Sequence, residues 1–383
     1  MIKNKYTIAQ ILPALNTGGV ERGVIEVSKS LVDNNFKSIV ISSGGHMETQ
    51  LKRTGSIHYT LDVNSKNPMK WRKIRKKLKF ILEKEKVDLI HFCSRAPAWI
   101  GFPLGIILDI PVITSVHMRF RKSNYFKKIY NSILTRGDAI IAISNHIEMS
   151  IKSIFPKVSN KIKLIHRGVD LNLFDANKIK PARIIAQSKL IGIKDSIPVI
   201  VMAARPALWK GYLVLFEALS KVKNNFQCVL IGAGDGNQKF QQQLINRIIK
   251  FNLEGKIKLV KSSRDIQAAM ILGDIVVMPS VTPEPFGRII VEAQALGKIP
   301  IAFDHGGASE TIIDGKTGFL AEANNASSLA EKISFALSLK DSKRQKMGEY
   351  SKKFVSKNFS HDRMCNLTIS LYKQCLAEHK RKS

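Results

Sequence analysis

The residues that most clearly suggest a chemical function lie in the second half of the chain. Glu284 and Glu292 are eight positions apart, and Pro285-Phe286-Gly287 between them leads into an apolar helical pattern. A carboxylate beside a helix N-terminus can hold a sugar hydroxyl while the helix end attracts a phosphate. Arg205 and Lys210 directly follow an apolar strand. Two cations there could bind a diphosphate, although by themselves they could equally be solvated bases beside a turn.

Two features of the first half could complete such a site. Gly18 and Gly19 follow the first apolar segment and open a helical one. Glycines there let the backbone turn tightly, and free N–H groups at the helix start favour an anion, but ordinary strand-to-helix turns look the same. His117 comes at the end of an apolar strand, where an isolated histidine is more often structural than functional.

Short apolar strands alternate with helical stretches along the chain, which predicts parallel sheets with helices on both faces. Two runs of about six strands predict an α/β protein of two doubly wound domains. We place the boundary at residue 180, which gives domains 1–180 and 181–360. The predicted strands are 6–12, 38–42, 89–92, 112–117, 139–143 and 162–165 in the first half, and 198–203, 227–231, 257–260, 275–278 and 299–303 in the second.

The composition is ordinary for a globular protein except for its charge. The 61 Lys and Arg outnumber the 30 Asp and Glu, which leaves a net charge of +31. Residues 1–190 hold 33 of these bases and 13 of the acids, so the excess is largest in the first domain and suggests an anionic partner for it. Four scattered cysteines without a Cys-x-x-Cys pair predict reduced thiols in a cytosolic protein.

No segment reaches the about 18 consecutive apolar residues that a membrane-spanning helix needs. The short apolar run near the N-terminus contains Gln10 and Pro13 and continues into a glycine turn. We therefore interpret it as the first strand of the fold rather than as a signal peptide.

Together the motifs resemble one family. Glu284 and Glu292 around Pro285-Phe286-Gly287 are similar to the E-x7-E motif of the retaining nucleotide-sugar glycosyltransferases of family four, which have the GT-B fold. Other landmarks occur in the family's order, namely a glycine loop at Gly18 and Gly19, an active-site histidine at His117, an inter-domain turn at 168–170, a phosphate pair at Arg205 and Lys210, a strand-end glycine at Gly234 and a glycine pair at 306–307. Two positions differ from the usual pattern, Arg167 before the turn and Arg288 after Phe-Gly.

The resemblance implies two Rossmann-like domains whose parallel sheets face a central cleft. Residues 181–360 would bind the nucleotide sugar, and residues 1–180, completed by a C-terminal helix at about 361–383, would bind the acceptor. Glu284 and His117 are the catalytic residues that it implies, both contacting the transferred sugar. The remaining donor-binding residues that it implies are Gly18, Gly19, Arg205, Lys210, Gly234, Phe286, Gly287 and Glu292, with Glu292 on the ribose.

The implied reaction retains the anomeric configuration by front-face attack, and the leaving phosphate takes the acceptor's proton. The donor would be a UDP-, GDP- or ADP-sugar, with no other cofactor. Because the sequence contains no Asp-x-Asp, we expect no metal site, and Arg205 with Lys210 would neutralise the leaving diphosphate.

Two basic segments suggest where the acceptor side lies. Residues 66–86 hold ten bases and two acids, with apolar residues at helical spacing, which predicts a basic amphipathic helix that either only packs on the sheet or also contacts a membrane. A basic and aromatic cluster after His117 includes Arg119, Arg121 and Lys122. Such clusters suit an anionic membrane, a phosphorylated acceptor or single-stranded nucleic acid.

The resemblance favours the membrane. It implies a glycolipid or lipid-linked acceptor, as in the synthesis of lipopolysaccharide or another bacterial cell-envelope glycan, and a protein peripherally associated with the inner face of the cytoplasmic membrane. One alternative is a same-fold sugar-nucleotide enzyme such as a 2-epimerase, which loss of the E-x7-E motif would favour. Another is a basic protein that binds membranes or nucleic acid, but no recognised motif for specific nucleic-acid binding occurs.

Overall fold

The computed structural model describes residues 6–16, 18–120 and 124–381. They form two units, one ending at Arg167 and resuming at His361, the other running from Gly168 to Ser360. The division falls before the predicted boundary at residue 180. The segment after Gly168 belongs to the second unit because the Val169 N–H donates to the Phe359 carbonyl at 2.8 Å.

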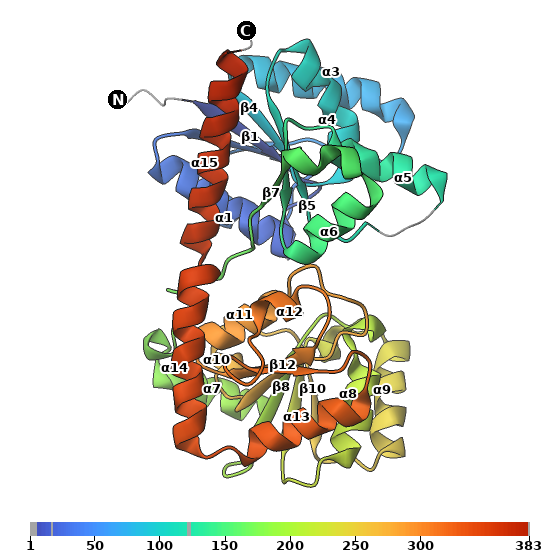
Figure 1. Ribbon diagram of the computed structural model, residues 1–383, viewed down its shortest axis with the longest axis vertical. Coiled ribbons are helices and arrows are strands. Elements are labelled where there is room, and N and C mark those ends of the chain that lie inside the picture. Colours follow the sequence, from blue (N-terminus) through green and yellow to red (C-terminus); the bar gives the residue numbers. More distant parts are fainter. Residues whose placement is uncertain (1–5, 17, 121–123, 382–383) are drawn as a thin grey trace. The chain divides into compact units, whose positions relative to one another are not determined.

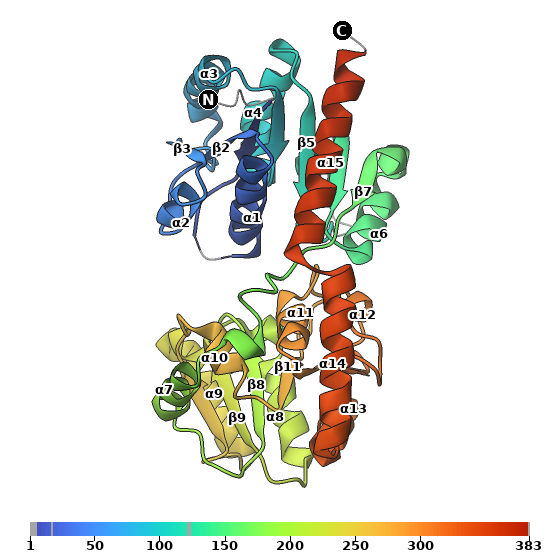
Figure 2. The ribbon, with the colours of Figure 1, turned by 90° about the vertical axis from the view of Figure 1, so that its left-hand side faces the viewer.

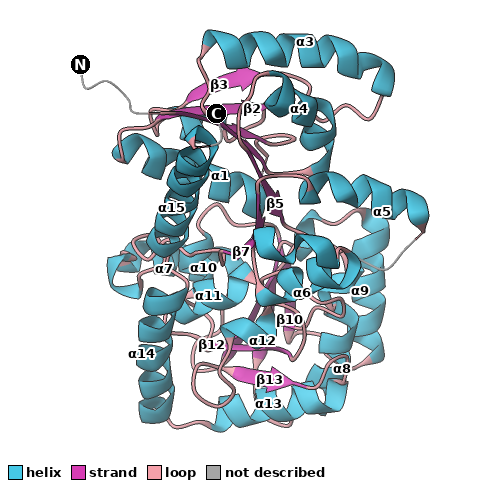
Figure 3. Ribbon diagram, turned by 45° about the horizontal axis from the view of Figure 1, so that its top comes forward, coloured by secondary structure: helices cyan, strands magenta, loops and turns pink. Residues whose placement is uncertain are grey.

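The first unit contains a parallel sheet of seven strands in the order β3-β2-β1-β4-β5-β6-β7, with helices on both faces (Figures 1 and 3). Its strands are β1 (Thr7–Ile11), β2 (Lys37–Ser42), β3 (Ile57–Thr60), β4 (Leu89–Phe92), β5 (Val112–Val116), β6 (Ala139–Ala142) and β7 (Ile162–Leu164). Its helices are α1 (Gly19–Asp33), α2 (Glu48–Lys52), α3 (Pro68–Lys84), α4 (Arg95–Ile107), α5 (Tyr125–Ser132), α6 (Asn145–Ile154) and α15 (His361–Lys380).

The second unit repeats this plan with six parallel strands in the order β10-β9-β8-β11-β12-β13. Its strands are β8 (Val199–Ala203), β9 (Gln227–Ile231), β10 (Ile257–Val260), β11 (Ile275–Met278), β12 (Ile299–Phe303) and β13 (Phe319–Ala321). Its helices are α7 (Pro181–Ile191), α8 (Tyr212–Lys221), α9 (Gln238–Lys250), α10 (Ile266–Met270), α11 (Arg288–Ala295), α12 (Ala308–Thr311), α13 (Ala326–Ser338) and α14 (Asp341–Asn358). Two parallel Rossmann-like sheets confirm the predicted fold class.

The strands form where the sequence is rich in Val and Ile because both faces of a parallel sheet are covered. Every residue of β1, β5, β9 and β12 is buried. The two strands that the sequence analysis did not predict, β3 and β13, lie at sheet edges. β3 is partly exposed and β13 has three residues, so neither produces a buried apolar run.

Helix α3 accounts for the basic segment 66–86. The Asn67 side chain caps it by accepting a hydrogen bond from the Met69 N–H at 3.0 Å. Its apolar stripe, Ile74, Leu78, Ile81 and Leu82, is buried in the first unit, so the stripe packs on the sheet. Met69 and Phe80 are exposed among the lysines, at 89% and 65%.

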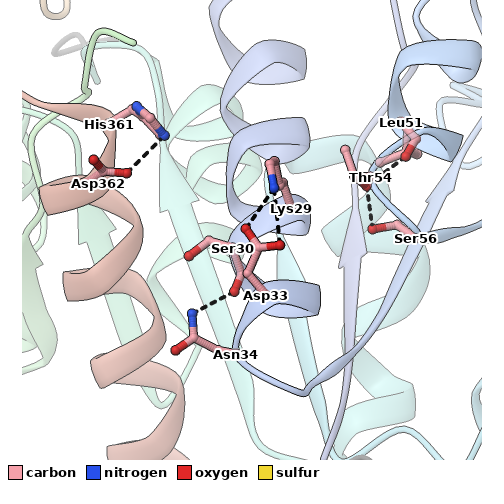
Figure 4. Close-up of polar contacts among 9 residues, drawn as sticks. All are labelled: Lys29, Ser30, Asp33, Asn34, Leu51, Thr54, Ser56, His361 and Asp362. Atoms are coloured by element: carbon pink, nitrogen blue, oxygen red, sulfur yellow. Dashed lines mark hydrogen bonds and ion pairs between the residues drawn. The ribbon is translucent and has the colours of Figure 1, made fainter. Parts of the chain in front are cut away.

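Polar contacts fix the C-terminal end of α1 (Figure 4). Lys29 Nζ lies 2.8 Å from an Asp33 carboxylate oxygen one turn later. The Asn34 side-chain amide donates to the Ser30 carbonyl at 2.8 Å and so satisfies one of the carbonyls left over at the helix end.

After the second unit the chain returns to the first unit as helix α15, which packs beside α1 (Figures 1 and 2). It brings Tyr372 into the core, where its hydroxyl is hydrogen-bonded to His91 Nδ1 at 2.6 Å. The other ring nitrogen of His91 is hydrogen-bonded to the Ser115 hydroxyl at 2.6 Å. Two neighbouring strands, β4 and β5, and the distant helix α15 therefore share one buried polar chain.

All four cysteines are buried and free. Among the described residues, no helix is long and apolar enough to cross a membrane.

Tyr372→Phe should lower the free energy of unfolding of the first unit by about 1–3 kcal/mol, because it leaves a buried nitrogen of His91 without its partner. Denaturant unfolding would measure the change. Tyr350→Phe is the matched control, because Tyr350 is half exposed on α14 and its hydroxyl should matter by at most about 0.5 kcal/mol. Equal effects of the two substitutions would contradict the prediction.

The first unit should also lose stability as the pH falls below about 6.5. Burial lowers the pKa of His91 from 6.5 to about 3, so between these values the unfolded chain binds a proton that the folded chain does not. Unfolding should become easier by up to about 1.4 kcal/mol per pH unit for this group. An unfolding midpoint that does not change between pH 7 and pH 5 would show that the buried ring is not linked to stability.

Candidate active site

The candidate residues of the second unit lie in loops at the carboxyl ends of β8 and β11. These adjacent strands are the place where the strand order of the sheet reverses. Ligands of open parallel sheets bind at such a point because neighbouring loops there diverge and leave a crevice. Residues 204–211 follow β8 and residues 279–287 follow β11, so the fold brings Arg205, Lys210 and Glu284 to one edge of one sheet.

Glu284 forms a buried ion pair with Lys210. Lys210 Nζ lies 2.6 Å from Glu284 Oε1, and the two side chains are 16% and 9% exposed. The Ser280 hydroxyl donates to the same oxygen, also at 2.6 Å. Both of these contacts reach the same carboxylate oxygen, Oε1. A carboxylate held through one oxygen can accept a hydroxyl through the other.

Direct contacts between the two loops fix this pair. The Val281 N–H donates to the Trp209 carbonyl at 2.9 Å. Gly211 has a φ of +89°, and a Cβ there would lie 1.7 Å from the Pro279 carbonyl oxygen. Only glycine fits such a close approach. The loop after β8 can therefore lie against the loop after β11, with Lys210 opposite Glu284.

A third loop, after β12, holds the backbone on both sides of the carboxylate. The Gly307 N–H donates to the Glu284 carbonyl at 2.8 Å. His305 Nε2 lies 2.7 Å from the Ser280 carbonyl, and since a carbonyl only accepts, this nitrogen carries the proton. Ser280 and Glu284 are thus fixed at their backbones as well as through the bond between their side chains.

Glu292 lies in α11, eight residues after Glu284 and about one turn from the helix start at Arg288. It is buried, and its Oε1 is 3.6 Å from Arg288 Nε on the same helix. Arg288 is therefore an ion-pair partner of Glu292. The ribose contact that the resemblance implies for Glu292 stays a prediction.

Phe286 and Gly287 connect the carboxylate loop to α11. The Phe286 side chain is buried, and its ring centroid lies 5.7 Å from that of Phe359. Gly287 is the N-cap of α11, with a φ of +87°. The Phe286 ring is therefore part of the core, and the donor contacts that the resemblance implies for these two residues stay predictions.

Arg205 and Gly234 lie after neighbouring strands of the same sheet. The Arg205 side chain is exposed, and its backbone carbonyl accepts a hydrogen bond from the Tyr212 hydroxyl at 3.2 Å. Burial raises the pKa of Tyr212, so this hydroxyl stays a donor. Gly234 lies in the turn after β9, packed against the backbone at Lys261.

His117 belongs to the first unit and follows β5. Both ring nitrogens are buried, with no hydrogen bond to a described residue. Burial, Arg167 and His91 hold the pKa of His117 well below its ordinary value, so the ring is neutral at physiological pH and can donate one hydrogen bond and accept another. It lines a cavity of about 20 Å³ together with Gln10, His91, Cys93, Ser115 and Arg167, among others.

Arg167 holds the glycine loop of the first unit. Its guanidinium donates to the Gly19 carbonyl. It also fills the space beside Gly23, where a Cβ would lie 2.2 Å from a guanidinium nitrogen. Gly18 is the N-cap of α1, and the Glu21 carboxylate lies close to it. Arg167, one of the two residues that differ from the family pattern, therefore stabilises the glycine loop directly.

The basic cluster after His117 is described only in part. Arg119 is exposed, whereas Arg121 and Lys122 lie outside the described residues. On α5, Tyr125 and Phe126 are 72% and 78% exposed. In the described part of the chain, no group of three or more His, Cys, Asp or Glu residues is placed to bind a metal ion.

Three residues of these sites were not predicted as functional. Ser280 directly follows the buried strand β11, and a hydroxyl at the carboxyl end of a strand was an available signal. His305 and Arg167 act on backbone carbonyls. No residue type marks a carbonyl partner, so sequence reasoning had no signal for these two.

The sequence matches two family descriptions that together span most of its length. Residues 17–173 match "Glycosyltransferase Family 4" and residues 185–354 match "Glycosyl transferases group 1". The N,N'-diacetylbacillosaminyl-diphospho-undecaprenol alpha-1,3-N-acetylgalactosaminyltransferase of Campylobacter jejuni is 32% identical over 183 residues, which are 46% of each chain.

Solved structures extend the likeness over the whole chain. The crystal structure of a glycosyltransferase from Rickettsia africae superposes with a TM-score of 0.90 at 36% identity, covering 97% of this chain and 99% of that one. Anabaena HepE, solved in complex with UDP-glucose, has a TM-score of 0.84 at 22% identity, covering 96% and 99%. At this low identity, the likeness to HepE shows only that the two proteins share a fold. With two Rossmann-like units of the GT-B type and sequence similarity along both, this chain belongs to the family 4 glycosyltransferases.

Proposed function

We propose that this protein is a retaining glycosyltransferase that moves a sugar from a nucleoside-diphosphate sugar to a lipid-linked or lipopolysaccharide-type acceptor without a metal ion. The observation that carries the proposal is the buried pair of Lys210 and Glu284 at the strand-order reversal of the second unit. The pair places a cation, which can bind a diphosphate, beside a carboxylate, which can accept a hydrogen bond from a hydroxyl of the attached sugar.

Each group has a distinct part in the proposed reaction. Lys210 and Arg205 stabilise the charge that develops on the leaving diphosphate, and preorganised cations are the largest contribution available in such a site. Glu284 Oε2 accepts a hydroxyl of the transferred sugar and orients it. The acceptor oxygen bonds to the anomeric carbon as the bond from that carbon to the phosphate breaks on the same face. The acceptor's proton passes to the leaving phosphate oxygen.

Relatives support the choice of substrates. Anabaena HepE was solved with UDP-glucose, which makes UDP the first nucleotide to test. The Campylobacter relative is named for an undecaprenol diphosphate acceptor, which supports a lipid-linked acceptor for this chain. We extend the proposal to peripheral association with the cytoplasmic face of a bacterial membrane.

The surface of the first unit supports this association. On α5, the exposed Tyr125 and Phe126 are followed directly by the exposed Lys127 and Lys128. Aromatic side chains favour the lipid headgroup region, and lysines are attracted to anionic lipids. The excess of positive charge in residues 1–190 adds a longer-range attraction to an anionic membrane.

UDP, GDP or ADP should raise the melting temperature of the second unit, and the rise should be the same with and without Mg²⁺. A ligand at 100 times its Kd stabilises by about 2.7 kcal/mol. Thermal unfolding with each nucleotide measures the shift, and Glu292→Ala should reduce it. If no nucleotide stabilises the protein, or if the shift requires Mg²⁺, the proposal is wrong in its donor or in its metal independence.

The protein should sediment with vesicles of phosphatidylglycerol and phosphatidylcholine but not with phosphatidylcholine alone. Phe126→Ser with Lys127→Gln and Lys128→Gln should reduce the bound fraction, because both the apolar and the electrostatic contributions are lost. Leu190→Ser is the matched control, since Leu190 is 76% exposed on α7 in the other unit. Equal binding by the triple variant and the wild type would exclude α5 as the contact.

A further inference from the structure

The ion pair between Lys210 and Glu284 joins two groups that the proposed function assigns to different parts of the donor. Lys210 is assigned to the diphosphate and Glu284 to the sugar. Without a ligand they already neutralise each other at 2.6 Å in a largely buried setting. The carboxylate is therefore the local competitor of any phosphate that approaches Lys210.

We propose that Glu284 also promotes release of the nucleoside diphosphate product, by competing with it for Lys210 and repelling it once the sugar has left. This inference rests on the proposed function. It assigns the carboxylate a second role, in the step after transfer.

The electrostatics differ before and after transfer. In the donor complex a sugar hydroxyl can donate to Glu284 Oε2, so the carboxylate contributes a favourable contact. After transfer that hydroxyl has gone with the acceptor. The buried carboxylate then lies beside a diphosphate with nothing between them but solvent, and like charges in a partly buried site repel strongly.

The carboxylate has no easy way to move aside. Its Oε1 accepts from the Ser280 hydroxyl as well as from Lys210, at 2.6 Å each. Its backbone carbonyl accepts from the Gly307 N–H, and the Ser280 carbonyl is bonded to His305. Because these contacts come from the loops after β8, β11 and β12, the charge stays in place while the ligand changes.

Whether removal of the Glu284 carboxylate raises or lowers the affinity for a nucleoside diphosphate distinguishes this role from a purely structural one. If Glu284 only positioned Lys210 for phosphate, its removal would weaken nucleoside diphosphate binding. If it competes for Lys210, its removal frees the ammonium and binding becomes tighter.

The test is calorimetric titration of UDP, GDP and ADP into the full-length protein and its variants. For the nucleotide that the wild type binds, Glu284→Gln should lower the Kd by about tenfold, the effect of roughly 1.4 kcal/mol. Lys210→Met should raise the Kd. In the double variant the gain from Glu284→Gln should largely disappear, because the two side chains no longer compete.

Glu331→Gln is the matched control. It removes the same charge from an exposed position on α13 of the same unit, so it should leave the Kd unchanged if the effect is local. Ser280→Ala keeps both charges but frees the carboxylate, and it should give a smaller gain. This variant also tests the inference if Glu284→Gln does not fold.

The outcomes distinguish the role of Glu284 in product release from the proposed function itself. Unchanged or weaker binding by Glu284→Gln, with normal binding by the wild type, overturns the role in product release and leaves the proposed function standing. An equal gain in Glu331→Gln overturns it too, because the effect would be one of net charge. If the wild type binds none of the three nucleotides, the proposed function itself fails.

Discussion

Parallel pairing of every strand is the constraint on which the candidate site depends. Since all strands of a sheet point the same way, all loops that follow them open at one edge. In the second unit this edge collects three loops, which follow strands ending at Ala203, Met278 and Phe303, and their contacts form a single network around Glu284. No one segment builds the site, which explains why its motifs are separated by long stretches of ordinary sheet and helix.

The motifs and the strand-helix alternation predicted most of this arrangement. The buried strands were predictable because covered parallel strands are continuously apolar. The strands β3 and β13 were not, because β3 is partly exposed and β13 has only three residues, so neither produces a buried apolar run. The sequence could predict only that Lys210 and Glu284 lie near each other. Which carboxylate oxygen Lys210 contacts, and the contact from Ser280, depend on the loop conformations that Gly211 and Gly307 permit.

The two departures from the family pattern illustrate the same limit. Arg167 and Arg288 occur at motif positions where the family commonly has other residues. In the structure each contacts a motif element of its own unit, Arg167 the glycine loop and Arg288 the buried Glu292. A substitution inside a motif is thus hard to interpret from sequence, because its effect depends on which neighbour it reaches.

The return of α15 to the first unit has a consequence for how the chain is made. The core of this unit includes Tyr372, Cys375 and Leu376, which a ribosome adds only after the whole second unit. The second unit is complete in sequence before them. A nascent chain therefore carries a first unit whose apolar surface along α1 and whose polar chain at His91 lack their partners until α15 has been made. The first unit is begun first but completes its core only after the second unit has been synthesised, and until then its apolar surface is open to chaperones and proteases.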